Sequence, residues 1–426
     1  MEKKSRKASE GQEQNVEVQL TLKLRDVVGE GLRELVQRAG MVSLEALLEQ
    51  ERTAVCGPAW GRRPAREYVR GGHAPGELCL GGRLVKVARP RVRRVSGGEV
   101  RLPSWQQFAR EDPLNERAVE QMVIGVSTRK YKRALEPLPE GFEERATSKS
   151  AVSRRFVAMT ADKLSALLKA PLEKLDVRVV MLDGIHFADH VIVVALGIDS
   201  QGKKHVLGLW EGATENAAVC VSLLTSLRDR GLSTKHSMLF VIDGGKAIAK
   251  AIAKAIQEVF GESALIQRCQ VHKRRNVLEH LPQSARPNTG ELISQAYSMR
   301  DPSLAKRRLE GLAKSLESAH PAAATSLREG LEETLTVMGI GLTHALTRSL
   351  STTNPIENLQ GSIRRTSRRV DRWRGGSMIL RWVATSVAEA AAGFRCLKGK
   401  ASMPTLIAYL KARDLELGLA SHSQAA

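Results

Sequence analysis

Two aspartates occupy matched positions in this sequence. Asp183 follows the apolar stretch 178–182, Asp243 follows the apolar stretch 237–242, and a glycine comes directly after each. In an open sheet, functional groups gather where strands end, so the two carboxylates converge if the strands are neighbours. Converging carboxylates repel unless a cation lies between them, and Mg²⁺ prefers such hard oxygen ligands. The alternative is that each aspartate only begins a turn; the matched context favours a metal site.

A third acid, Glu357, comes early in a predicted helix. Asn354 suits the N-cap and Pro355 the first helical position, which would place Glu357 at the third position of a capping box. The residue types leave metal binding and helix capping both open. The downstream arginines favour metal binding. Arg364, Arg368 and Arg372 are spaced by four residues, which predicts one helix face, and Arg365 and Arg369 lie beside them. A carboxylate followed by such a ridge suits a phosphodiester substrate, whose phosphates the arginines would neutralise.

Cys269 and His272 form a Cys-x-x-His pair directly after a predicted strand. Structural zinc needs four ligands, and the sequence offers no second Cys/His pair at a recognised spacing. We therefore place Cys269 and His272 at the edge of the active site rather than in a zinc site.

Composition narrows the class of protein. The chain has 426 residues, of which 66 are Lys or Arg and 46 are Asp or Glu, so the formal net charge is +20. This charge argues against a neutral metabolic enzyme and favours a polyanionic partner. The longest apolar run is too short to span a membrane, and residues 1–17 carry no apolar segment of a secretory signal. Five scattered cysteines fit a reducing cytosol.

The α/β part of the chain has a recognisable order of elements. Strands are predicted at 178–182, 191–198 and 205–210, followed by a helix at 214–230, a strand at 237–242, a helix at 246–260 and a strand at 264–268. The first three strands are expected to form an antiparallel meander. This order, in which three strands are followed by a helix, a strand, a helix and a strand, is the layout of a ribonuclease-H-like core.

Seven regions are expected along the chain. They are a disordered leader at 1–17, a helix and basic strand-rich region at 18–113, a helix-turn-helix region at 114–170, the ribonuclease-H-like core at 175–270, a helical insertion at 271–345, a C-terminal helical part of the core at 346–415, and a polar tail at 416–426.

Two regions before the core are candidates for contact with DNA. Residues 57–110 carry 12 Lys or Arg and three acids, and short basic strands are predicted at 84–88 and 91–95. The alternative for this region is an ordinary solvated surface. In the helix-turn-helix region, helices are predicted at 115–124 and 128–135, and a third begins near Ser148. Lys149, Ser153, Arg154 and Arg155 lie near the start of this third helix, where a recognition helix reads the major groove; a plain helical linker is the alternative.

Several motifs together resemble one family. They are the segments 125–130, 148–154, 182–184, 206–209, 267–276 and 354–358, and the Trp- and Arg-containing segment 369–382. The chain resembles the Mutator-type transposases of bacterial insertion sequences over most of its length. The resemblance implies a D-D-E transposase whose catalytic acids fall on Asp183, Asp243 and Glu357, with the family's C-x-x-H signature on Cys269 and His272.

The resemblance also implies a mechanism and partners. Two Mg²⁺ or Mn²⁺ ions would activate water for strand nicking and then the freed 3′-hydroxyl for attack on target DNA. The partners would be double-stranded DNA, as element ends and as target, and at least one further copy of the chain, because two ends must be paired. The expected location is the bacterial cytoplasm, at the nucleoid. A nuclease of the same fold and a non-catalytic DNA-binding regulator are the rival interpretations.

Overall fold

The computed structural model describes residues 32–60, 66–80, 82–110, 113–135, 143–145, 147–212, 217–243 and 246–419. The predicted leader 1–17 and most of the predicted tail lie outside these residues. The chain divides into two compact units, Met1–Met159 and Thr160–Ala426, which are described separately below. No helix in the described ranges has the length and apolar character needed to cross a membrane.

The first unit is built on a long β-hairpin. Its elements are α2 (Leu32–Cys56), β1 (Tyr68–Leu80), β2 (Arg83–Arg94), β3 (Glu99–Val100), α3 (Pro103–Arg110), α4 (Pro113–Val123), η1 (Lys132–Ala134) and β4 (Glu144–Arg145). Strands β1 and β2 pair antiparallel, and β3 and β4 each add a short pairing to β2. Leu48 of α2, Leu78 and Val92 of the hairpin and Trp105 of α3 form its buried core.

The prediction of two short basic strands at 84–88 and 91–95 is wrong. They form one continuous strand, β2, which passes through Pro90. Pro90 lies opposite His73, next to a register shift in β1. A proline has no N–H to donate to a ladder, and an irregular pairing is where a strand tolerates one. The predicted break between the strands is therefore a local irregularity within a single hairpin.

The predicted helix-turn-helix region also differs from expectation. Helix α5 (Lys149–Lys169) begins as predicted, and the Ala151 N–H donates to Ser148 Oγ at 3.3 Å. The helix predicted at 128–135 is wrong, because only a turn and η1 occur there. Tyr131 is fully buried and its hydroxyl donates to the Gly82 carbonyl at 2.9 Å, which ties this turn to the hairpin. Strand β4 also lies between α4 and α5, so these helices are not joined by the short turn of a helix-turn-helix.

The second unit contains a five-stranded sheet in the order β7-β6-β5-β8-β9. The strands are β5 (Val177–Phe187), β6 (His190–Asp199), β7 (Lys204–Gly212), β8 (Met238–Ile242) and β9 (Ala264–Arg268). Strands β5, β6 and β7 form an antiparallel meander, whereas β8 and β9 run parallel to β5. The mixed α/β architecture and the predicted order of strands are confirmed.

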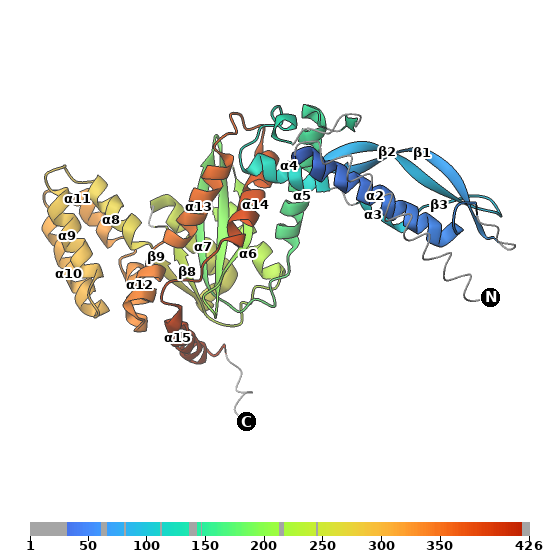
Figure 1. Ribbon diagram of the computed structural model, residues 1–426. Helices are drawn as coiled ribbons and strands as arrows, with labels where there is room; N and C mark the ends of the chain where they lie inside the picture. The colour runs from blue at the N-terminus through green and yellow to red at the C-terminus, as the bar shows by residue number, and fades with distance from the viewer. Residues whose placement is uncertain are drawn as a thin grey trace, which may run out of the picture. The chain divides into compact units, whose positions relative to one another are not determined.

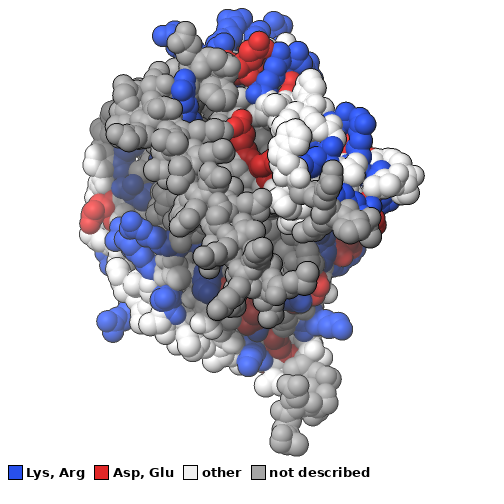
Figure 2. Space-filling view, turned by 45° about the vertical axis from the view of Figure 1, so that its right-hand side comes forward, with Lys and Arg blue, Asp and Glu red and all other residues white. Residues whose placement is uncertain are grey.

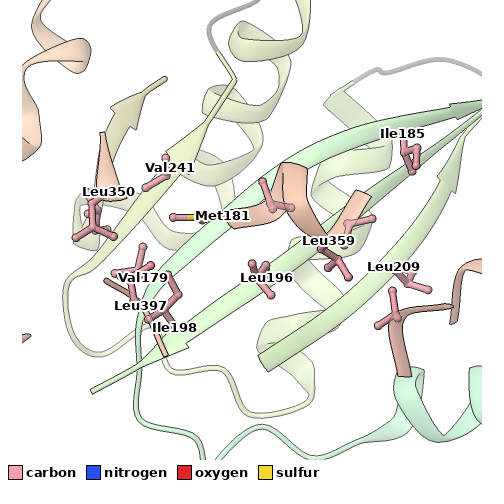
Figure 3. Packing of buried hydrophobic residues seen from close by; sticks show 14 of the residues in the cluster. Val179, Met181, Ile185, Leu196, Ile198, Leu209, Val241, Leu350, Leu359 and Leu397 are labelled. Atoms are coloured by element: carbon pink, nitrogen blue, oxygen red, sulfur yellow. The ribbon is translucent and has the colours of Figure 1, made fainter. Parts of the chain in front are cut away.

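Both faces of this sheet are covered by helices (Figure 1). On one face, α6 (Ala217–Asp229) and α7 (Lys246–Phe260) pack against Val180, Leu182 and Phe240. On the other face, α13 (Asn354–Ser367) and α14 (Gly376–Ala392) pack against Val179, Met181 and Val241. Leu359 of α13 lies close over this second face (Figure 3). Successive residues of β5 alternate between the two cores, as the period of a strand requires.

Strand β5 is longer than predicted. Its parallel pairing with β8 ends where Leu182 meets Ile242, but its antiparallel pairing with β6 continues to Phe187. Asp183 therefore does not follow the strand. It lies within β5 at the point where the ladder to β8 stops, next to the end of β8.

The region 271–345 is helical and contains no strand, as predicted. Helices α8 (Gln270–Glu279), α9 (Arg286–Tyr297), α10 (Pro302–Leu316) and α11 (Pro321–Arg328) share a buried core of their own. They form a helical group beside the sheet (Figure 1). Two 3₁₀ turns, η3 (Glu332–Thr334) and η4 (Thr336–Ile340), and α12 (His344–Leu350) lead back to α13, and η5 (Lys400–Ser402) and α15 (Met403–Glu416) end the described chain.

The predicted arginine ridge is wrong. Helix α13 ends at Ser367, Arg368 is its C-cap, and α14 begins only at Gly376. Arg364 and Arg365 lie in the last helical turn, but Arg369 and Arg372 lie in the link between the helices. The buried face of α13, which includes Ile356, Leu359 and Ile363, ends at Ser367, and packing of such a face normally holds a helix. On the face that Figure 2 shows, Lys and Arg side chains are widely spread, with acidic side chains among them.

Candidate active site

Asp183 is a buried carboxylate held by two donors. It is 8% exposed. Its Oδ1 accepts the Gly184 N–H at 2.9 Å, and its Oδ2 accepts from Gln360 Nε2 at 2.8 Å. The Gln360 amide also donates to the Gly184 carbonyl at 3.1 Å, which ties α13 to β5. The carboxylate is thus fixed in direction by one backbone group and one side chain.

His272 contacts both Asp243 and Glu357. The His272 Nδ1 lies 2.8 Å from Asp243 Oδ1, and the Nε2 lies 3.7 Å from Glu357 Oε1. Asp243 follows β8, His272 belongs to the first turn of α8, and Glu357 belongs to the first turn of α13. Three segments far apart in sequence therefore converge at the end of β8, beside Asp183 of β5. We call Asp183, Asp243 and Glu357 the acid cluster.

Thr353, the N-cap residue of α13, connects Glu357 to Cys269. Its hydroxyl lies 2.6 Å from Glu357 Oε1, 3.3 Å from Cys269 Sγ and 3.2 Å from His272 Nδ1. The Thr353 backbone N–H also points to Cys269 Sγ, at 3.4 Å. Cys269 is itself anchored, because its N–H donates to the Ile242 carbonyl at the end of β8. The sheet, α8 and α13 are thus joined through Cys269 and Thr353.

The structure does not support the capping-box interpretation of Glu357. The N-cap is Thr353 rather than Asn354, and the Thr353 N–H is engaged by the Cys269 sulfur. Glu357 lies one turn into the helix and accepts from the Thr353 hydroxyl instead of the N-cap N–H. Its side chain is 39% exposed. Its carboxylate is therefore directed into the cluster of acids and not used to close the end of the helix.

The electrostatics of Asp183 reflect burial and crowding by like charges. Burial, followed by the charges of Asp243 and Glu357, raises the pKa of Asp183 to about 7, although the Gly184 N–H and the His272 charge oppose the change. Both Asp243 and Glu357 are thus close enough to Asp183 for their charges to raise its pKa.

The pKa values of His272 and Cys269 shift in opposite directions. The hydrogen bond to Asp243, followed by the one to Cys269, raises the pKa of His272 to about 10 despite partial burial. Burial raises the pKa of the Cys269 thiol, but the contacts with His272 and Thr353 outweigh it and the net change is downward. The two predicted edge residues thus interact with each other, and His272 also contacts Asp243 and Glu357.

Two donor sets are available to a cation. Asp183, Asp243 and Glu357 offer only carboxylate oxygens, which suit Mg²⁺ or Mn²⁺. Cys269, His272 and Glu357 offer one sulfur, one nitrogen and one oxygen that lie within 4.8 Å of one another. The second set has three members, whereas a structural zinc site needs four, and the sulfur is already engaged by Thr353. Among the described residues only the second set has its ligand atoms this close together, and the oxygen set is favoured by the chemistry of its donors alone.

The predicted DNA-contacting residues differ in exposure. Lys149, Ser153 and Arg154 are exposed on the first turns of α5, and Arg155 is half-buried. Arg364, Arg365, Arg368, Arg369 and Arg372 are all exposed. Their side chains are accessible, but those after Ser367 do not share a helix face.

Sequence reasoning missed Gln360 and Thr353. Gln360 lies three residues after Glu357, almost one helical turn on, so its position on the same side of α13 was readable once Glu357 was chosen. Thr353 precedes the predicted cap, and its role depends on the approach of Cys269, which no local pattern encodes.

Comparison with known proteins identifies the family. The model of the family described as "Transposase, Mutator family" matches residues 11–395. The chain is 30% identical over 346 residues to the transposase for insertion sequence element ISRM5 of Rhizobium meliloti, which covers 79% of this chain and 81% of that protein. It is 27% identical over 373 residues to the transposase for insertion sequence element IS406 of Burkholderia multivorans, which covers 85% of this chain and 90% of that protein. A match of this extent shows that the chain belongs to the Mutator family of transposases.

Proposed function

We propose that the chain catalyses metal-dependent cleavage and strand transfer of DNA at the ends of an insertion sequence, with Asp183, Asp243 and Glu357 as its catalytic acids. The observation that carries this proposal is the convergence of three carboxylates from β5, β8 and α13 in a member of the Mutator family. In the same proposal, the sheet β7-β6-β5-β8-β9 is a ribonuclease-H-like core interrupted by the helices α8 to α11.

The acid cluster fits two Mg²⁺ or Mn²⁺ ions by the chemistry of its donors. When bound there, the ions would stabilise the attacking and leaving oxygens of a phosphodiester in turn. Asp183 is oriented for this by the Gln360 amide and the Gly184 N–H. Glu357 is oriented by the Thr353 hydroxyl. His272 holds a proton next to Asp243, so its positive charge offsets part of the repulsion among the carboxylates.

DNA recognition is assigned to other regions of the chain. We assign the reading of element ends to α5, whose exposed Lys149, Ser153 and Arg154 are compatible with contact to base edges. The basic hairpin and the arginines 364–372 would neutralise backbone phosphates without sequence preference. The protein would act as a homodimer or larger assembly that pairs two ends, at the nucleoid of the bacterial cytoplasm.

A strand-transfer assay with Glu357→Gln tests the proposal. Gln is similar in size to Glu but lacks the negative charge that holds a divalent cation. We expect the variant to fold and to bind element ends like the wild type, and to lose both cleavage and strand transfer in Mg²⁺. Near-normal strand transfer by the variant would remove Glu357 from the catalytic set. Hydrolysis without transfer by the wild type would favour the rival nuclease function.

A further inference from the structure

A second site, distinct from the acid cluster, also lies at the start of α13. A cleft of about 590 Å³ opens between α12, the first turn of α13 and the segment that follows α14. Its basic lining residues come from three places in the chain: Lys204 at the start of β7, Arg348 in α12, and Arg395 and Lys398 after α14. No acidic residue is among the described residues that line it. We call this site the basic cleft.

The cations of the cleft have no carboxylate partner. Across the described ranges, none of Lys204, Arg348, Arg395 and Lys398 forms an ion pair. Arg348, Arg395 and Lys398 are exposed, whereas Lys204 is half-buried with its Nζ 5.9 Å from the centre of the Phe394 ring. Burial lowers the pKa of Lys204, so an anion bound beside it would relieve a desolvation cost. Four unpaired cations around one cleft form an electrostatic site for a polyanion.

The neutral lining of the cleft also suits phosphate groups. The side-chain amides of Asn354 and Asn358 lie four residues apart on α13, whereas the hydroxyls of Thr352 and Ser349 donate to backbone carbonyls of α12. Such amides donate to phosphate oxygens in protein–DNA complexes, beside Arg and Lys. The cleft therefore combines charge with hydrogen-bond donors, as a backbone-binding surface does.

The position of the cleft relates it to the acid cluster. Asn354 and Asn358 line the cleft, whereas Glu357, between them on the same helix, contacts His272 of the cluster. Thr352 faces the cleft, and the next residue, Thr353, contacts Glu357. One segment thus separates the two sites. A strand of B-DNA carries a phosphate for about every 3.4 Å of helix axis, so a strand that reaches the cluster presents several phosphates within a short reach of it.

We infer that the basic cleft binds the phosphodiester backbone of the DNA strand whose scissile phosphate lies at the acid cluster. This inference rests on the proposed function for the identity of that strand. The contact is expected to be independent of sequence, because it is made to backbone phosphates, which carry no sequence information. The cleft would hold the strand next to the segment of α13 that carries Glu357.

Cys396 provides a direct probe of the cleft. It lines the cleft and is exposed, whereas Cys56, Cys220 and Cys269 are buried. The experiment measures the alkylation rate of Cys396 in the full chain by mass spectrometry of its peptide, in Ca²⁺ or without metal, with and without a duplex oligonucleotide. With DNA at about ten times its Kd, we expect alkylation to slow about tenfold, equally for an element end and a random duplex. Inorganic phosphate at the same phosphate concentration should give no protection.

Variants supply a second, independent readout. Arg348→Gln and Arg395→Gln should each lower the slope of log affinity against log salt by about 1, and by about 2 together. The matched control is Arg307→Gln, an exposed arginine of α10 without an ion pair among the described residues, which should leave the slope unchanged. Circular dichroism would verify that each variant is folded.

The outcomes separate this inference from the proposed function. Unprotected Cys396 together with an unchanged salt slope would overturn the basic cleft, even if Glu357→Gln abolishes strand transfer as expected. Protection by inorganic phosphate alone would also overturn it, in favour of a small-anion site. Protection by duplex DNA with a reduced slope would support the cleft even if the wild type failed to transfer strands, in which case the proposed function would fall alone.

Discussion

The two sides of the first turn of α13 are opposite in character. In the acid cluster, Asp183 is buried, with 8% of its surface exposed, and its two oxygens accept from Gly184 and Gln360. The basic cleft is open, and Arg348 and Arg395 are exposed with no carboxylate partner. Hydrogen bonds thus hold the Asp183 carboxylate in place, whereas no ion pair within the described part of the chain holds the side chains of Arg348 and Arg395.

The difference follows from what each side would have to do. Chemistry at a phosphorus atom requires oxygens held within a fraction of an ångström, which a rigid sheet and bonded side chains supply. Neutralising a backbone requires only positive charge at the right range, and long flexible side chains achieve this with little geometric demand. Substitutions on the acid side should therefore have large effects on rate, and those on the basic side small effects on affinity.

The largest effect is expected from Asp243→Asn. This change removes a charge that faces both His272 and the expected metal ions, so strand transfer in Mg²⁺ should fall by about a thousandfold or more. Gel-based strand-transfer rates would measure it, with Asp229→Asn on the surface of α6 as the control. A loss below tenfold would mean that Asp243 only holds His272.

A smaller loss of rate is expected from Thr353→Val. The change keeps the shape of the side chain but removes the hydroxyl that donates to Glu357, so Glu357 would lose its orientation. Partners of metal ligands are typically worth about 10–100-fold in activity or metal affinity. We expect a loss in that range that is partly restored at high Mg²⁺, which a titration of rate against Mg²⁺ would show.

Thr353→Ser is the matched variant, because it keeps the hydroxyl and should stay within a few-fold of the wild type. If both variants lost activity equally and higher Mg²⁺ restored neither, Thr353 would be important only for packing at the start of α13.

The sequence predicted some parts of this architecture well and others poorly, for physical reasons. Helix α7 and strand β9 have the bounds predicted, because glycines and a change of hydrophobic period mark their ends. The extent of β5 was missed because pairing with β6 continues after pairing with β8 stops. The local sequence pattern of a strand does not show which of its two neighbouring strands stops pairing with it first.

The candidate site shows the same division. Asp183, Asp243 and Glu357 were chosen by residue type and family resemblance, and the fold brings them to one place. The contacts of Thr353 with Cys269 join residues 84 positions apart, so they depend on tertiary packing. The arginine ridge failed because i, i+4 spacing says where residues would lie on a helix, not that the helix continues.

Stability of the metal-free protein should depend on the acid cluster through Asp183. Its folded-state pKa of about 7 is above the ordinary value of 3.8, so between about pH 4 and 7 the unfolded chain binds fewer protons. The free energy of unfolding should therefore fall as the pH rises through this window and level off above it. The cost at pH 8 is on the order of 4 kcal/mol.

Asp183→Asn should remove most of this cost, although its amide would face the Gln360 donor and forfeit part of the gain. We expect a net stabilisation of about 1–3 kcal/mol at pH 8 in EDTA and none at pH 4. Urea denaturation at both pH values measures it. An equal change at the two pH values would show that the substitution acts through packing rather than charge.

The smallest effects are expected from the exposed arginines, and two of them distinguish positioning from reading. Arg368 caps the end of α13, so Arg368→Gln should weaken binding to element ends and to random DNA equally and lower the salt slope by about 1. Arg154 is exposed near the start of α5, and Arg154→Ala should weaken binding to element ends more than to random DNA. Titrations of both duplexes at several salt concentrations give the comparison. Equal losses on the two duplexes for Arg154→Ala would place α5 among the backbone contacts and leave the reading of the ends to another part of the chain.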